Sequence, residues 1–286
     1  MWVLILVVGV ATGIHMFWNR TSEGFQSQLQ QLQQSQLQQL QHQLQLQPQS
    51  VDSVDSVDSV DSVDSVDNPL DLPWIASLTP LDRRARAGQA CAPLSIEKGP
   101  SNTTIERVPA SCESGMAHTQ AGDRILLPIS IPRSEEAETI RHELVHIDQR
   151  RNPQEWAAFY ARAWGFKMQR DPPKGLPYIW VQRRRSNPDT QFGGPWVEWR
   201  GRFWSFAVYT REPSLQHANT VWWDADTNTL QTDPPAGWTA FFGELSQDEH
   251  PHEIAAVLGV GEATQTEAGR RLFAWSRSRS RVLDAE

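Results

Sequence analysis

The sequence predicts an α+β fold for residues 69–286, preceded by a part that does not build a core. Downstream of residue 69, segments with helical periodicity are interspersed with aromatic and β-branched segments bounded by turn residues. Upstream, an apolar run is followed by two low-complexity tracts. The downstream region is long enough to bury a sizeable core.

Residues 1–18 contain no Asp, Glu, Lys or Arg, and tryptophans stand near both ends of the run. As a helix, this run spans about 26 Å, the low end of what a bilayer core requires. Flanking aromatic residues suit the two membrane interfaces. We therefore predict a single-pass membrane anchor, and the alternative is a signal peptide, cleaved near the small residues Ala11 and Gly13, that leads to secretion.

Residues 19–68 are predicted to be a largely disordered linker. Leucines recur through the Gln-rich stretch 25–47, which also allows a weak self-associating coiled coil. From residue 50 to 67 the triplet Val-Asp-Ser repeats, and its regularly spaced like charges extend the segment. Both stretches indicate a spacer between the membrane and a folded domain.

The formal net charge is −8, and most of it resides on the aspartates of the Val-Asp-Ser repeat. The folded part is therefore nearly neutral, which argues against nucleic acid as a partner, because phosphate binding requires a clustered positive field. The two cysteines, Cys91 and Cys112, are too few for a structural zinc knuckle. They form one disulfide in an oxidising compartment, or they stay reduced elsewhere.

Turn residues and hydrophobic periodicity define the elements of the folded part. A strand is expected over residues 122–130, and a helix capped by Ser134 is expected to run to Arg151, before an Asn-Pro pair. The helix dipole stabilises the glutamates in its first turn. The later expected elements are a helix over 153–169, strands within 180–242 with a hairpin tip at 224–228, and helices over 251–258 and 262–276.

The most informative segment is His142-Glu143-Leu144-Val145-His146, inside the capped helix. Residues four apart share one helical face, so the two imidazoles can reach a single ion, with Glu143 beside them. Two nitrogens and one further ligand leave a coordination position for water, as in catalytic zinc sites. The pattern predicts a zinc-dependent hydrolase with Glu143 as general base. An ordinary amphipathic helix with two histidines is the simpler alternative.

The strand over 122–130 and this motif-bearing helix resemble those of the zincin metallopeptidases. The resemblance implies a zincin-like catalytic domain over residues 69–286, with the active-site helix packed under a small sheet. It also implies a zinc cofactor and a peptide or protein substrate. Asp148 departs from the family pattern, which usually has a hydrophobic residue there. The metzincin branch is excluded, because its glycine and third histidine would fall at Gln149 and Asn152.

The remaining gluzincin-like arrangement implies a glutamate ligand on a later helix. Glu253 is the preferred candidate, because Pro251 can open a helix and small alanines follow the carboxylate. Glu155 is the alternative, although a first-turn dipole partner is its simpler role. We expect His250 and His252 to be surface residues rather than ligands.

Other polar residues have weaker assignments. Tyr160, Tyr209 and His217 are candidates for a donor to the developing oxyanion. Asp148 is a candidate acceptor for the second ring hydrogen of a ligand histidine. The arginines at 183–185 could contact an acidic substrate or a carboxy terminus, but a solvated turn is the preferred interpretation.

Together these predictions describe a membrane-tethered zinc metallopeptidase with His142, His146 and Glu253 as ligands and Glu143 as the catalytic residue. Two other classes of protein fit the same sequence. One is an inactive binding module that keeps the zinc site. The other is a membrane-tethered structural protein that self-associates through its Gln/Leu tract.

Overall fold

The computed structural model describes residues 77–191, 193–210, 214–261 and 265–283. The chain divides into two units, Met1–Ser59 and Val60–Glu286, and all described residues belong to the second unit. The predicted anchor over residues 1–18 and the linker over residues 19–68 lie outside the described residues. Within the described ranges, no helix is both long enough and apolar enough to cross a membrane.

The observed fold is α+β, as predicted, with two small sheets. The first sheet has the order β1-β2-β4-β3, with β2 parallel to β4 and the outer pairs antiparallel. Only β4 lies within a predicted strand. The strands of this sheet are β1 (Ser95–Lys98), β2 (Thr104–Val108), β3 (His118–Gln120) and β4 (Arg124–Pro128).

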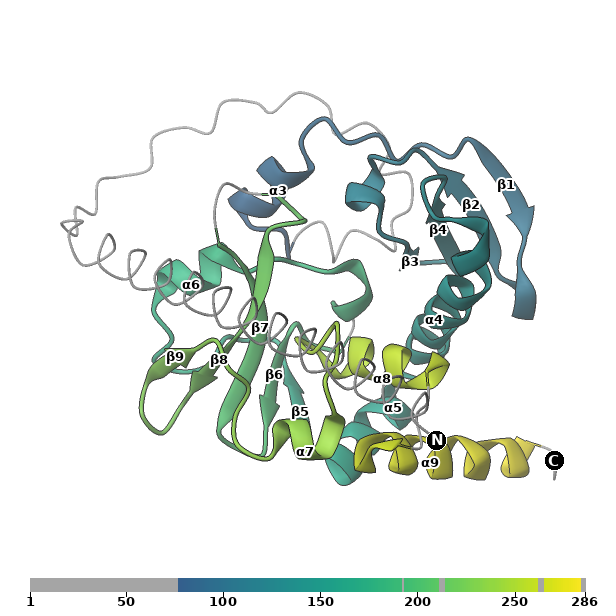
Figure 1. Cartoon of the computed structure of the whole chain (residues 1–286). Helices are drawn as coiled ribbons and strands as arrows, with labels where there is room; N and C mark the ends of the chain where they lie inside the picture. The colour runs from purple at the N-terminus through teal and green to yellow at the C-terminus, as the bar shows by residue number, and fades with distance from the viewer. Residues whose placement is uncertain (1–76, 192, 211–213, 262–264, 284–286) are drawn as a thin grey trace, which may run out of the picture. The chain divides into compact units, whose positions relative to one another are not determined.

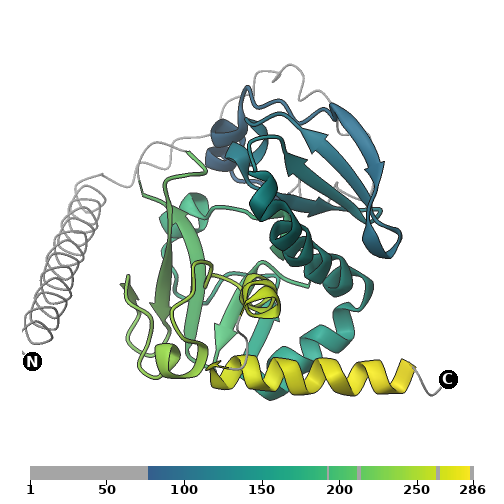
Figure 2. The ribbon, with the colours of Figure 1, turned by 45° about the vertical axis from the view of Figure 1, so that its right-hand side comes forward.

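Helix α4 (Arg133–Arg151) is the predicted motif-bearing helix, and it packs on one face of the first sheet (Figures 1 and 2). Its N-cap is Pro132, so the prediction that Ser134 caps the helix was wrong. Pro132 is in extended conformation (φ −60°, ψ 142°), and the helix begins directly after it, at Arg133, without a side-chain cap. An aliphatic cluster joins helix and sheet, namely Ile105, Ile125, Leu127, Ile140, Leu144 and Ile147.

The predicted second helix over residues 153–169 was only half right. Helix α5 (Pro153–Phe159) continues into one π-helical turn, η4 (Tyr160–Trp164), and ends at Gly165 with φ of 77°. The next residues form strand β5 (Phe166–Gln169), which pairs with β6. Sheet pairing thus overrides the helical periodicity of this segment.

The second sheet is an antiparallel meander in the order β5-β6-β7-β8-β9, and its connection after β8 is the predicted hairpin tip. Its buried face and the helices around it form an aromatic core that includes Trp164, Trp199, Trp222 and Trp238. The strands are β6 (Trp196–Trp199), β7 (Phe203–Tyr209), β8 (Ala218–Asp224) and β9 (Thr229–Gln231). Helix α6 (Tyr178–Arg183) overlaps the start of the region predicted as strands.

Helix α8 (Pro251–Val260) confirms the predicted helix at 251–258, and it lies between α4 and the second sheet (Figures 1 and 2). Small residues allow the close approach: Ala255 and Ala256 are buried, and an added Cβ at Gly259 would lie 3.3 Å from Val145 Cγ2. The remaining helices are α7 (Trp238–Phe242) and α9 (Glu267–Leu283), the latter displaced toward the C-terminus from its predicted range.

Charged groups and a disulfide hold the segments that precede α4. Cys91 and Cys112 are bonded, with their Cα atoms 4.8 Å apart. In helix α3 (Pro80–Arg86), buried Asp82 accepts hydrogen bonds from Tyr209 Oη at 2.8 Å and from Ser186. Arg86 donates to Asp82 and to Glu113. Glu113 follows Cys112 in the 3-10 turn η3 (Cys112–Gly115). These contacts anchor α3 to loops from both sheets.

Candidate metal centre

Helix α4 brings the two motif histidines together. The four-residue spacing places His142 and His146 on one face, and their Nε2 atoms lie 3.1 Å apart. His146 is buried, whereas His142 is half-buried. Their rings meet edge to face, with centroids 4.8 Å apart.

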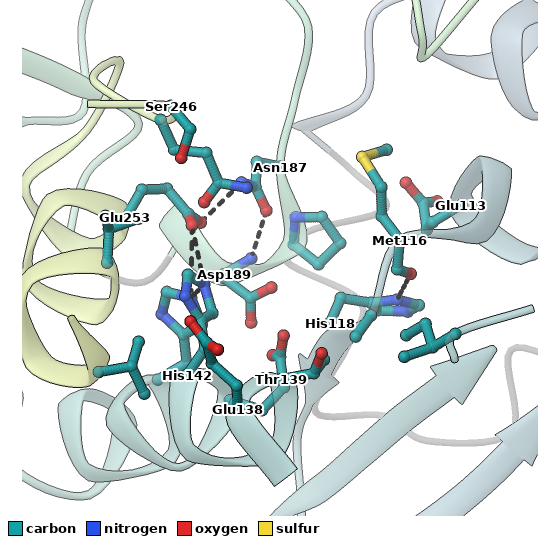
Figure 3. Close-up of a pocket in the computed structure, with 18 of the residues that line it drawn as sticks. Glu113, Met116, His118, Glu138, Thr139, His142, Asn187, Asp189, Ser246 and Glu253 are labelled. Atoms are coloured by element: carbon teal, nitrogen blue, oxygen red, sulfur yellow. Dashed lines mark hydrogen bonds and ion pairs between the residues drawn. The ribbon is translucent and has the colours of Figure 1, made fainter. Parts of the chain in front are cut away.

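Glu253 on α8 completes a triangle of ligand-type atoms. Its Oε2 lies 3.4 Å from the Nε2 atom of each histidine (Figure 3). A tetrahedral zinc ion with bonds of about 2.0–2.1 Å places its ligand atoms about 3.3–3.4 Å apart. The three atoms therefore have the spacing of three corners of such a tetrahedron. The predicted residue Glu253 thus lies with the two histidines.

The alternative third ligand, Glu155, lies elsewhere. Its side chain is 57% exposed, and its carboxylate pairs with Arg279 at 2.8 Å. His250 and His252 are buried, so the expectation that they are surface residues was wrong. The Nδ1 atom of His250 accepts from the amide of His252 and caps α8, and the ring of His252 contacts the carbonyl of Asp189.

Buried amides orient the candidate ligands. Gln149 is fully buried, and its Oε1 accepts from His146 Nδ1 at 2.8 Å. This bond leaves the Nε2 lone pair of His146 available for a cation, the usual role of such a partner. Gln149 Nε2 donates to Tyr160 Oη and to the carbonyl of His252, which ties α4 to η4 and α8. On the other side, Asn187 Nδ2 donates to Glu253 Oε1 at 2.7 Å.

Glu143 is buried beside the triangle, and its Oε2 has no hydrogen-bond partner in the described part of the chain. Burial, together with the nearby charge of Asp189, raises the pKa of the Glu143 carboxyl well above its usual range. The carboxylate of Asp189 is held in place, because its Oδ1 accepts from the amide and the hydroxyl of Thr119. An unpartnered buried carboxylate oxygen is rare and suits a group that acts on a small molecule such as water.

The electrostatics of the centre favour a positive charge. Burial lowers the pKa of His146, but the carboxylates of Glu253 and Asp189 outweigh it and raise that pKa to about 10. Burial alone would raise the pKa of Glu253, but His146 and His142 hold that pKa well below its usual range. Carboxylates that favour the charged form of a histidine also attract a metal cation, which displaces the proton.

Several predicted roles do not match the structure. Asp148 does not contact a histidine; it accepts from Trp156 Nε1 at 2.8 Å and from Arg279 at 2.6 Å. The hydroxyl of Tyr160 accepts from Gln149 Nε2, and the hydroxyl of Tyr209 donates to Asp82. Neither tyrosine lines the cavity, and the third oxyanion candidate, His217, does not line it either.

The centre opens into a cavity of about 550 Å³ (Figure 3). Residues that the sequence did not single out as site residues form much of its wall, notably Met116, His118, Asn187 and Asp189. The Asn-Pro-Asp segment at 187–189 indicated only a turn. Nothing local in the sequence places it opposite α4, because that contact depends on tertiary packing.

Comparison with models of protein families, with curated proteins and with solved structures finds no match to this chain. The assignment of the metal site therefore depends on the geometry of the residues alone. Two groups among the described residues could hold a metal ion: His142 with His146 and Glu253, and Glu143 with His146 and Asp189. The first group contains both imidazoles and has the near-regular triangle, so we assign the candidate metal site to it.

Proposed function

We propose that the protein is a zinc-dependent metallopeptidase with a zincin-like catalytic domain. The observation that carries the proposal is the triangle of two Nε2 atoms and one carboxylate oxygen, with edges of 3.1, 3.4 and 3.4 Å, beside the buried Glu143. The order of elements supports it, because a strand leads into the motif helix and the third ligand comes from a later helix.

In this proposal His142, His146 and Glu253 would hold the ion, which would supply a Lewis acid and acidify a bound water. Glu143 accepts the proton of the attacking water and delivers it to the leaving amine nitrogen. Gln149 keeps the ring of His146 in the required tautomer, and Asn187 orients Glu253. The amide of the substrate is consumed and a carboxylate and an amine are released.

Two imidazoles and one carboxylate also suit iron(II) in oxygenases. Glu143 favours hydrolysis, because a base beside the ion serves proton transfer to and from water. Elemental analysis of the purified protein separates the two metals directly. Zinc at about one equivalent per chain is the expected result.

The decisive experiment compares three glutamate variants of the full chain. Glu143→Gln is expected to lose about 10²–10⁴-fold in peptide cleavage while keeping its zinc, because it removes the base and not a ligand. Glu253→Ala is expected to lose zinc and activity together. Glu155→Gln, the matched control, is expected to keep both, because its carboxylate lies away from the centre.

The readouts are zinc content by mass spectrometry and cleavage of a peptide mixture. Activity that survives Glu143→Gln contradicts the proposal, and so does a wild-type chain that binds no zinc. Zinc retained without any turnover is the outcome expected of an inactive binding module.

We also propose that residues 1–18 anchor the enzyme in a membrane and that residues 19–68 are the spacer. The absence of charged residues from the first run supports this proposal. Deleting residues 1–68 is then expected to release an active enzyme from the membrane fraction. Loss of all activity in the soluble fragment is instead the result expected of a protein that works by self-association through its Gln/Leu tract.

A further inference from the structure

Three consecutive arginines stand at the C-terminal end of helix α6, of which Arg183 is the last residue, and their surroundings differ. Arg183 Nε donates to the carbonyl of Tyr209 at 2.9 Å. Arg184 is buried, lies over the ring of Trp196 and donates to Ser186 Oγ. The expectation of a solvated turn was therefore wrong for Arg184.

Arg185 lines the cavity of the candidate metal centre. Its backbone amide donates to the carbonyl of Ala207 at 2.8 Å, so the main chain is fixed. Its side chain donates from Nη2 to Met116 Sδ at 3.5 Å, and a thioether is a weak acceptor; its charge also acts on Glu249. Its Nε is buried without a hydrogen-bond partner in the described ranges. A buried N–H of a permanent cation without an acceptor is costly, and such donors are usually satisfied.

The charges around the cavity make Arg185 distinctive. It is the one arginine among the described lining residues, and no lysine lines the cavity there. The other charged side chains of the wall are mostly carboxylates, of which Glu135 and Glu138 on α4 are exposed. Arg185 is therefore the one arginine or lysine of the described wall that can attract an anion. A guanidinium offers a planar pair of donors that matches a carboxylate.

We propose that Arg185 binds a carboxylate group of the substrate and thereby selects the peptides that the enzyme cleaves. This inference rests on the proposed peptidase function. Arg185 contacts Met116, and Figure 3 shows Met116 on the side of the cavity away from Glu253. The bound carboxylate therefore lies apart from the reacting bond. It comes from an acidic side chain or from a free carboxy terminus, and the two sources share the same chemistry.

Binding of short N-acetylated peptides tests the proposal. Four peptides of one core sequence carry Glu or Gln at one position and a free or amidated carboxy terminus. Affinity is measured by titration calorimetry on the full-length Glu143→Gln chain, which is expected to cleave peptides about 10²–10⁴-fold more slowly. Peptides with the recognised carboxylate are expected to bind about tenfold or more tightly than the neutral peptide, as bonds to a charged group imply.

Variants of the arginines locate the effect. In the same background, Arg185→Gln is expected to remove the preference while leaving affinity for the neutral peptide within about twofold. Arg185→Lys is expected to keep part of the preference, because it keeps the charge but not the planar pair of donors. Arg183→Gln is the matched control and is expected to keep all of it, because Arg183 does not line the cavity.

Equal affinity of the charged and neutral peptides in the parent chain overturns the inference, and so does a preference that survives Arg185→Gln. The first result needs no arginine variant, so a variant that fails to fold does not protect the proposal. The proposed peptidase function is judged separately, by zinc content and by cleavage in the wild-type chain. A preference for carboxylate peptides without cleavage by the wild-type chain would contradict the proposed peptidase function but support carboxylate binding by Arg185.

Discussion

The two regions of the folded chain are stabilised by different means. The first region, residues 77–151, has a small aliphatic core, a disulfide, and buried charges around Asp82 and Arg86. The second region, residues 153–283, has a large aromatic core in which tryptophan and phenylalanine rings pack edge to face. The candidate metal centre takes its histidines from the first region and Glu253 from the second. Its integrity therefore depends on both kinds of stabilisation.

The largest effect is expected in the aromatic core. Trp238 is buried, with ring centroids 4.4 Å from Trp222 and 5.0 Å from Trp199. Trp238→Ala should lower the free energy of unfolding by about 3–5 kcal/mol, because it leaves a cavity that the rigid rings cannot fill. Chemical denaturation measures the loss. Tyr178→Ala, at a 71% exposed position, is the control and should change stability by less than about 0.5 kcal/mol.

The first region should instead respond to loss of one buried charge. Asp82→Ala removes one of the two carboxylate partners of Arg86 and leaves Tyr209 and Ser186 without this acceptor, so we expect a loss of about 3 kcal/mol. Although burial raises the pKa of Asp82, Arg86 and the hydrogen bonds outweigh it and lower that pKa overall. The stabilisation is therefore present above about pH 4 and is lost as the pH falls toward the lower folded-state pKa.

Acid titration of unfolding measures this dependence. The wild-type chain should lose stability below about pH 4 more steeply than Asp82→Ala, which lacks the titrating group. Parallel acid profiles of the two proteins would show that Asp82 does not contribute in this way.

The disulfide should matter most to the first region. Removing it with Cys91→Ser and Cys112→Ser should cost about 3 kcal/mol for a loop of this size. The segment from Cys112 to His118 forms one wall of the cavity, so its amide hydrogen exchange should accelerate. Exchange in the strands of the second sheet should change less. Uniform acceleration of exchange in both regions would show that the disulfide stabilises them alike.

Gln149 tests the seam between the regions, because it contacts His146, Tyr160 and His252. Gln149→Ala should weaken metal binding by about 10–100-fold, since His146 loses the acceptor that orients its ring. Competition with a metal chelator measures the affinity. Gln154→Ala, on the exposed surface of α5, should leave it unchanged. An unchanged affinity in Gln149→Ala would show that α4 alone orients the histidine.

The smallest effect is expected where charge lies on the surface of the second region. Glu267 pairs with Arg270 and Arg271, and all three side chains are exposed. Glu267→Ala should shift the melting temperature by less than about 1 °C. A shift as large as that of Asp82→Ala would mean that exposed and buried charges contribute alike.

The sequence predicted the elements whose signals are local. The i, i+4 histidine spacing, the Asn-Pro stop after Arg151 and the Pro-Glu-Ala pattern around Glu253 identified α4, α8 and the three residues that meet. The strands β1 to β3 were missed, because they are short and partly exposed, and β1 has no buried residue.

The rest of the site depends on tertiary contacts that no periodicity encodes. Gln149 follows His146 by three residues, but its role requires the carbonyl of His252 from a distant helix. Arg185 and Asp189 were read as parts of turns, and only the packing of their loop against α4 and η3 places them in the cavity. Asp148 was a candidate partner for a histidine, but its helix directs it to Trp156 and Arg279 instead.

The position of Glu253 on α8 has a consequence for the lifetime of the protein. Any cation held by this triangle bridges two helices that are distant in sequence, so occupancy and folding are thermodynamically linked. Free metal at a hundred times its dissociation constant would add about 2.7 kcal/mol to the stability of the native state. In a metal-poor compartment the same chain would open more often at the seam between α4 and α8, where proteases would find it first.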